Sequence, residues 1–341
     1  MSRRIAFCSD GTWEGTDGNT NVYKIFKAIV AIPGEQYPVY DDGVGADGTP
    51  IERLLGGAAG TGLFQKIKDG YSAISSVYEE GDEVFLFGFS RGAYTARSLA
   101  GMIAICGLPT KNPDTNLVNT AFEAYRSKDR RAAIMATLGG YGLVDAKLTM
   151  VGVWDTVGSL GIPALVGGVD PLLYGFLDTG LHPDVLNAYH AVSIDERRRE
   201  FPATLWTGPF AAGQIVDQVY FCGVHGDVGG GYVDDSGTGT TLSDITLSWM
   251  MSKAQALGLS FDPAVAARFP SPIDKKYALD TKHESWSPLW LFPKSREIAQ
   301  NAALANSVEL RWQIDVTYRP PNLSPAGGLP GAGYDRRTVV A

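Results

Sequence analysis

The sequence has few of the residues that mark disulfide-rich or metal-binding proteins. Its 341 residues include only three cysteines and four histidines. Cys8, Cys106 and Cys222 each lie in an apolar stretch, which predicts buried free thiols rather than a disulfide framework or a metal site. The odd number without regular spacing indicates synthesis in a reducing compartment. We expect neither a metal ion nor an organic cofactor.

Basic residues and long apolar runs are also scarce. The 29 Lys and Arg residues against 37 Asp and Glu give a formal net charge of -8, and without a basic stripe we expect no nucleic-acid partner. The apolar run 5–8 is too short for a signal peptide, and no run approaches the roughly 18 residues that span a bilayer. We expect a cytoplasmic protein, exported, if at all, by a leaderless route. Contact with a membrane surface stays open.

What is present is an alternation of strand-like and helix-like segments. Extended patterns occur at 4–9, 39–40, 83–87, 148–154 and 217–224, and helical periods at 21–31 and 64–78. This predicts an α/β fold with a mostly parallel central sheet, helices on both faces and loop insertions. With no convincing linker, we predict one domain over 1–341, with a core of about 1–260. Residues 261–341 would pack on it as an extension, with an extended tail from 318.

One turn carries the most specific chemical signal. The buried-strand pattern 83–87 is followed by Gly-Phe-Ser-Arg-Gly at 88–92 and then by a helix start. Strand, G-x-S-x-G and helix is the nucleophile elbow of serine hydrolases, in which the turn is so tight that both glycines must lack a Cβ. Ser90 is therefore the candidate nucleophile; the alternative is an ordinary Gly-rich turn between strand and helix.

A serine nucleophile needs a general base in reach. His225 ends the strand pattern 217–224 and enters a Gly-rich loop, the position in which a base is expected. His182 and His190 flank an expected helix and His283 lies in a polar loop, so surface or structural roles are the better interpretation for these three. A strand-end histidine without a catalytic role is the alternative for His225.

The base in turn needs an orienting carboxylate between Ser90 and the base in chain order. Asp155 directly follows the strand 148–154 and meets this requirement, although a helix N-cap is the other common role of such an Asp. Asp145 precedes the strand, and Asp227 is too close to His225 in sequence to be the usual partner.

An acyl-transfer site also needs backbone donors for the oxyanion. The amide of Arg91, directly after the nucleophile, is the first candidate. The loop Asp10-Gly11-Thr12 is the candidate for the second, because its small residues let the backbone approach the substrate. Asp10 could instead brace this loop through side-chain hydrogen bonds.

Several segments together resemble one family. They are 7–13, 19–23, 88–97, 153–158, 189–198 and 223–232, with an echo at 320–323. This set resembles the DUF2235 family, the α/β-hydrolase catalytic domain of Tle1-like type VI secretion phospholipase effectors. The resemblance implies that Ser90, Asp155 and His225 are nucleophile, acid and base, and that the reaction is carboxylic-ester hydrolysis with phospholipid substrates. It also implies a secretion-system or immunity partner if the chain is an effector.

Two other functions are compatible with the same residues. One is a soluble esterase or thioesterase that acts on small acyl substrates, and the other is a binding protein that keeps the hydrolase scaffold without chemistry. The apolar segments 160–177 and 286–293 are candidates for a lid or an interfacial patch, or else close the core. The charge run 195–199 is expected to be a solvated helix end with local ion pairs rather than a binding surface, and its place in the family match points to structural pairing.

Overall fold

Eight parallel strands form the central sheet of the computed structural model, which describes residues 2–11, 19–42, 58–110, 113–157, 180–290, 292–323 and 333–341. Their order is β10-β9-β8-β7-β6-β3-β1-β2, and each neighbouring pair is parallel. The strands are β1 (Arg4–Ser9), β2 (Gln36–Asp41), β3 (Glu83–Phe89), β6 (Lys147–Trp154), β7 (Asn187–Ser193), β8 (Ile215–Phe221), β9 (Ala303–Ala305) and β10 (Asp335–Arg337). Two shorter strands, β4 (Leu108–Pro109) and β5 (Leu143–Val144), pair antiparallel elsewhere. The predicted α/β fold is confirmed.

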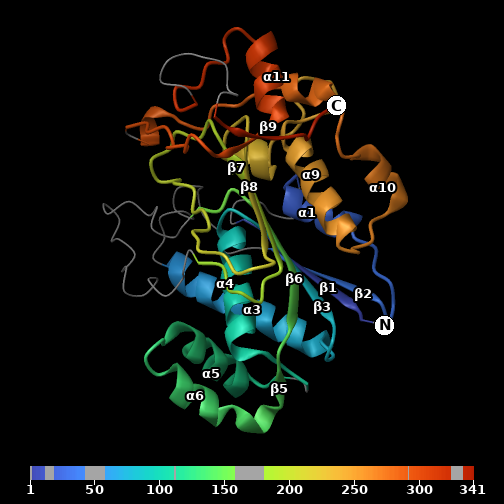
Figure 1. Ribbon diagram of the computed structural model, residues 1–341, viewed down its shortest axis with the longest axis vertical. Helices are drawn as coiled ribbons and strands as arrows, with labels where there is room; N and C mark the ends of the chain where they lie inside the picture. The colour runs from blue at the N-terminus through green and yellow to red at the C-terminus, as the bar shows by residue number, and fades with distance from the viewer. Residues whose placement is uncertain are drawn as a thin grey trace.

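Helices cover both faces of this sheet (Figure 1). One face carries α1 (Asn21–Ala28) and α9 (Ser243–Ala256), and the other carries α3 (Ala58–Val77), α4 (Arg91–Cys106) and α5 (Thr115–Arg126). In the described residues the other helices are α6 (Arg131–Thr137), α8 (His225–Gly229), α10 (Pro263–Arg268) and α11 (Asn306–Ile314), with 3-10 turns η1 (Gly139–Tyr141), η4 (Lys275–Leu279) and η5 (Pro288–Trp290).

The strands show why the sheet needs two helical layers. In β1, Ile5 and Phe7 belong to the core under α3 and α4, whereas Ala6 and Cys8 belong to the core under α1 and α9. Successive side chains of a strand point to opposite faces, so an apolar residue at every position requires cover on both sides. All three cysteines are buried and free, as predicted.

The strand β7 corrects one sequence expectation. His190 was expected beside a helix, but it lies in the middle of β7, where all seven residues are buried. Its ring Nε2 accepts a hydrogen bond from the Thr156 amide at 3.0 Å, and Nδ1 lies 3.5 Å from Gln218 Oε1. Burial lowers the pKa of His190 to about 3. The expectation of a satisfied structural histidine is therefore confirmed, in a different secondary structure.

The C-terminal region also differs from the expected extended tail. It supplies β9 and β10 to the edge of the sheet, and it buries Tyr318, Leu323, Val339 and Val340 in the core shared with α9. These described residues are part of the core, not a surface tail. No helix within the described ranges is long and apolar enough to cross a bilayer.

Candidate active site

Ser90 occupies a strained turn between β3 and α4. Its φ of 57° and ψ of -121° lie in a region that non-glycine residues rarely adopt. A Cβ added at Gly88 would lie 2.3 Å from the carbonyl oxygen of Gly92, and one added at Gly92 would lie 2.1 Å from that of Ser9. Neither position can accept a side chain. The geometry is that of the nucleophile elbow predicted from the sequence.

The structure brings Asp155 and His225 to the same edge of the sheet as Ser90. The amide of Ser90 donates to the carbonyl of Trp154, the last residue of β6, at 3.1 Å. Asp155 follows directly, and its Oδ2 lies 2.6 Å from Nδ1 of His225, the first residue of α8. Ser90 and His225 line one cavity of about 160 Å³.

The surroundings of His225 favour one tautomer and the neutral ring. A carboxylate oxygen at Nδ1 requires the proton on that nitrogen, which leaves Nε2 as the proton acceptor. The imidazole packs against Phe89 and Phe201, with ring centroids 4.5 and 5.2 Å away. Burial lowers the pKa of His225 below its usual range, against the opposing effect of Asp155. A neutral base near neutral pH follows.

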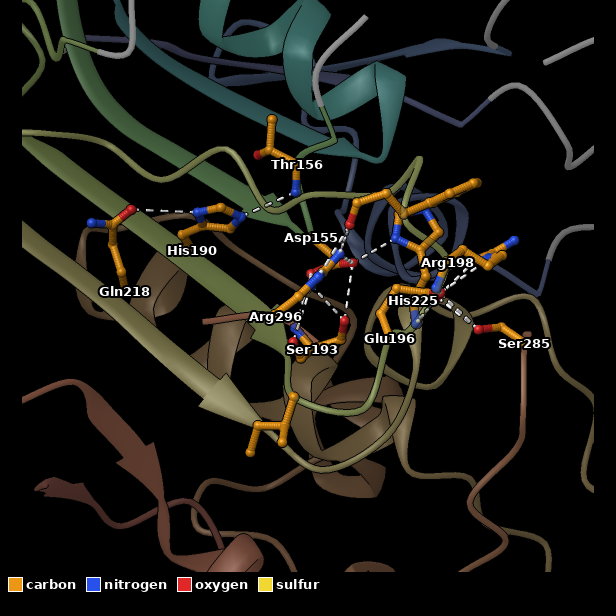
Figure 2. A network of polar contacts seen from close by, with 12 residues as sticks. Asp155, Thr156, His190, Ser193, Glu196, Arg198, Gln218, His225, Ser285 and Arg296 are labelled. Atoms are coloured by element: carbon orange, nitrogen blue, oxygen red, sulfur yellow. Dashed lines mark hydrogen bonds and ion pairs between the residues drawn. The ribbon is translucent and has the colours of Figure 1, made fainter. Parts of the chain in front are cut away.

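Asp155 is fully buried and receives more donors than a triad requires (Figure 2). The Ser193 amide donates to Oδ1 at 2.9 Å, and the Arg296 guanidinium donates to both oxygens, at 2.6 and 3.0 Å. Burial alone would raise the pKa of this carboxyl, but Arg296 and His225 outweigh it, so the pKa lies well below its usual range. Asp155 is a carboxylate.

The predicted oxyanion donors within the described residues have different surroundings. Arg91 is the first residue of α4, where backbone amides have no acceptor within the helix and the helix dipole favours negative charge. Gly11 lines the cavity, but its amide donates to Asp10 Oδ1 at 2.7 Å, which argues against a role as the second donor. Thr12 lies outside the described residues.

Asp10 instead braces the loop, the alternative raised from the sequence. Its Oδ2 accepts hydrogen bonds from the hydroxyl groups of Thr20 at 2.6 Å and Tyr40 at 2.8 Å. The buried carboxyl thereby ties the end of β1 to α1 and β2. Burial raises its pKa above the usual range, against the lowering effect of these donors.

The rival acids occupy other positions. Asp227 accepts hydrogen bonds from the Val224 amide at 3.0 Å and from the ring of His283 at 2.6 Å, so its carboxylate belongs to a different pair. Asp145 precedes β6 and lies at the opposite end of that strand from Asp155. His182, partly exposed, faces Asp184.

The charge run 195–199 is not the solvated helix end expected from the sequence. Glu196 is fully buried and accepts hydrogen bonds from Arg198, from the Ser285 hydroxyl and from the His225 amide. Arg198 lines the cavity and stacks on Phe201, with its guanidinium carbon 3.7 Å from the ring centroid. Within the run, Arg198 contributes to the wall of the cavity and the buried Glu196 holds it there, a role that no local sequence pattern signals.

The two apolar segments proposed as lid or patch have different outcomes. Residues 160–177 lie outside the described part of the chain. In the segment 286–293, Trp290 packs edge-on against Phe201, with ring centroids 5.6 Å apart, and Phe292 is 75% exposed. This segment thus connects the wall of the cavity to the protein surface.

Comparisons with known proteins show what this chain is similar to. A Saccharomyces cerevisiae protein, Uncharacterized protein YEL023C, is 29% identical over 232 residues, which cover 60% of this chain and 33% of the yeast protein. The chain thus spans about a third of the length of that relative. Two solved structures are similar. An uncharacterized protein from Pseudomonas aeruginosa has a TM-score of 0.49, 17% identity, and coverage of 79% of this chain and 49% of the other. A Tle1 effector bound to the VgrG spike of the type 6 secretion system has a TM-score of 0.44, 14% identity, and coverage of 85% and 82%.

The family-model comparison covers most of the chain. Residues 3–253 match the model of the type VI secretion phospholipase effector Tle1-like catalytic domain. This range includes Ser90, Asp155 and His225. The chain belongs to the Tle1-like catalytic-domain family.

Proposed function

We propose that this chain is a serine ester hydrolase with Ser90 as nucleophile, His225 as general base and Asp155 as the orienting acid. The observation that carries the proposal is the coincidence of a strained serine at a glycine-bounded elbow with a buried Asp155–His225 hydrogen bond of 2.6 Å at the same cavity. No conventional structural role requires this combination.

The steps follow from the positions of the groups. Ser90 Oγ attacks the ester carbonyl carbon while His225 Nε2 takes the hydroxyl proton, and the carbonyl oxygen becomes an oxyanion. The Arg91 amide at the start of α4 stabilises that oxyanion. His225 then returns the proton to the leaving alcohol. Water, deprotonated by the same nitrogen, hydrolyses the acyl-enzyme and regenerates Ser90.

Phospholipids are the proposed substrates, and the family supports this choice. Phe292 is exposed and lies two residues from Trp290, which packs against the cavity-lining Phe201, so it is suited to contact a lipid surface. As a member of an effector family, the chain is proposed to be made in the cytoplasm, to be exported and to engage a secretion-system or immunity partner. Other ester substrates and those partners are separate questions for experiment.

The experiment compares the parent with Ser90→Ala on phosphatidylcholine–phosphatidylglycerol vesicles and on a soluble p-nitrophenyl butyrate substrate. Released fatty acid and lysophospholipid are measured by mass spectrometry. The expected result is Ser90-dependent release from vesicles, and no labelling of Ser90→Ala by a fluorophosphonate probe. Activity on the soluble ester alone would favour a soluble esterase. Equal activity of parent and variant would refute the nucleophile assignment.

A further inference from the structure

We propose that Arg296 is a positioning residue of this active site. It orients the Asp155 carboxylate toward His225 and thereby affects how readily the Asp155–His225 pair takes up a proton. The inference rests on the proposed function, since it assigns a role within the proposed triad. Arg296 lies in the coil between η5 and β9, beyond the residues 3–253 that match the family model.

The contact between Arg296 and Asp155 is a buried two-pronged ion pair. Nη1 lies 2.6 Å from Oδ1 and Nη2 lies 3.0 Å from Oδ2. The side chain of Asp155 is fully buried and that of Arg296 is 6% exposed. A planar guanidinium that meets both carboxylate oxygens fixes the rotation of the carboxyl group as well as its position, which an ammonium group cannot do.

The other hydrogen bonds of Arg296 go to the Ser193 hydroxyl at 2.6 Å and to the backbone around the site. Nη1 also donates to the Ser193 carbonyl at 3.0 Å, and Nε and Nη2 donate to the Phe201 carbonyl at 3.1 and 2.7 Å. Phe201 forms a wall of the imidazole pocket, with its ring centroid 5.2 Å from that of His225. Figure 2 shows Arg296 against Asp155. Because Arg296 also binds the Phe201 carbonyl, one side chain positions both the acid and the aromatic ring that packs against His225.

The charges around the base give this arrangement a functional consequence. His225 is surrounded by two carboxylates, Asp155 and Glu196, and two guanidiniums, Arg198 and Arg296. Neutralising one guanidinium leaves an excess of negative charge beside the pair. Proton uptake by the pair then becomes easier, so the pH below which the base is protonated rises. For buried charges a few ångströms apart, we expect a rise of about one pH unit.

The test measures kcat and kcat/KM against pH for hydrolysis of p-nitrophenyl butyrate. The acid limb is the part of the profile in which kcat/KM falls as the pH is lowered. Arg296→Met is expected to shift this limb to a pH about one unit higher. It is also expected to lower kcat roughly tenfold or more, with a smaller change in KM. Arg296→Lys keeps the positive charge but cannot bind both carboxylate oxygens at once. Its acid limb is therefore expected at nearly the same pH as that of the parent, while its kcat is still reduced.

Arg311→Met is the matched control. Arg311 is another buried arginine of the C-terminal region; it donates to the carbonyls of Ala278 and Asp280 rather than to the triad. It is expected to lower stability without moving the acid limb. The proposal would be overturned if folded Arg296→Met had its acid limb at the same pH as the parent. It would also be overturned if Arg311→Met shifted the limb by the same amount.

A second measurement separates this inference from the proposed function. In isotope-labelled Ser90→Ala, which needs no turnover, the Cε1–H NMR signal of His225 reports its protonation directly, and the chain has only four histidines to assign. The titration midpoint is expected to rise by about one pH unit when Arg296→Met is added. A midpoint that rises in a protein without Ser90-dependent activity would support the Arg296 role and refute the hydrolase. An unchanged midpoint in a protein with Ser90-dependent activity would refute the Arg296 role and support the hydrolase.

Discussion

Asp155→Asn is the substitution whose effects on activity and stability the structure predicts in most detail. The carboxylate accepts hydrogen bonds from the amide and hydroxyl of Ser193, from both terminal nitrogens of Arg296 and from His225. An asparagine of the same shape has one acceptor oxygen and a donating NH₂ group. At least one buried donor must then face another donor, and the charge of Arg296 loses its direct counter-ion.

Both activity and stability should respond. Loss of the acid favours the wrong imidazole tautomer, and the corresponding change in serine hydrolases lowers kcat about 10⁴-fold. Breaking a buried ion pair costs about 3 kcal/mol of unfolding free energy. A chain of this length has an unfolding entropy near ~0.7 kcal/mol/K, so Tm should fall by about 4 °C.

The pH dependence of the stability loss identifies its cause. The pKa of Asp155 is depressed in the folded state, with burial opposed by the larger combined effects of Arg296 and His225. Its stabilisation is therefore complete above the unfolded pKa of about 4 and is lost as the pH falls below that value. The Tm of Asp155→Asn should therefore lie about 4 °C below that of the parent at pH 7. This difference should become smaller in buffers below about pH 4.

Calorimetry and initial-rate assays on parent, Asp155→Asn and Ser90→Ala check this reasoning. Ser90→Ala removes no ion pair, so its Tm should stay within about 1–2 °C of the parent while activity is lost. If Asp155→Asn retained a tenth of the parental activity, or melted at the parental temperature at pH 7, the assignment of Asp155 as the ion-paired acid would be wrong.

Two further predictions concern the elbow and the lipid surface. Gly92→Ala places a Cβ 2.1 Å from the Ser9 carbonyl oxygen and should lower Tm by several degrees and abolish labelling of the nucleophile; Gly139→Ala, with open space around it, should match the parent in both assays. Phe292→Asp should weaken activity on vesicles roughly tenfold, from lost apolar burial, and leave the soluble ester unaffected; the equally exposed Val316, changed to Asp, should leave both activities intact, and a loss of both in Phe292→Asp would contradict the interfacial role.

The parts of the fold and site that could be predicted are those with local signals. The elbow is a short pattern, because the two glycines, the apolar strand β3 and the start of α4 are adjacent in sequence. Asp155 and His225 could be found because parallel strands end at one edge of the sheet, so the residues that follow β6 and β8 meet there. Whether these three residues catalyse ester hydrolysis stays a prediction.

The strand β7 could not be predicted because its polar residues are satisfied at a distance. Asn187 donates to the Thr149 carbonyl at 2.8 Å, and His190 bonds to the Thr156 amide. Alternation of apolar and polar residues indicates a half-exposed strand, but here both faces are buried and the polar groups find partners on the neighbouring strand. Tertiary hydrogen bonds of this kind leave no mark on local periodicity.

Arg296 illustrates the same limit at the site itself. It meets Asp155 across 141 residues of sequence, from a coil whose composition does not distinguish it from a solvated loop. The sequence could have indicated this arginine only indirectly. A fully buried carboxylate needs more positive charge nearby than one neutral imidazole supplies, so a cationic partner for Asp155 could have been expected. The coil lies beyond residue 253, where the family match ends, so we predict that relatives with the same serine, aspartate and histidine need not share it. Relatives that have these three residues but lack an arginine here should then lose activity at a higher pH than this chain does as the solution is made more acidic.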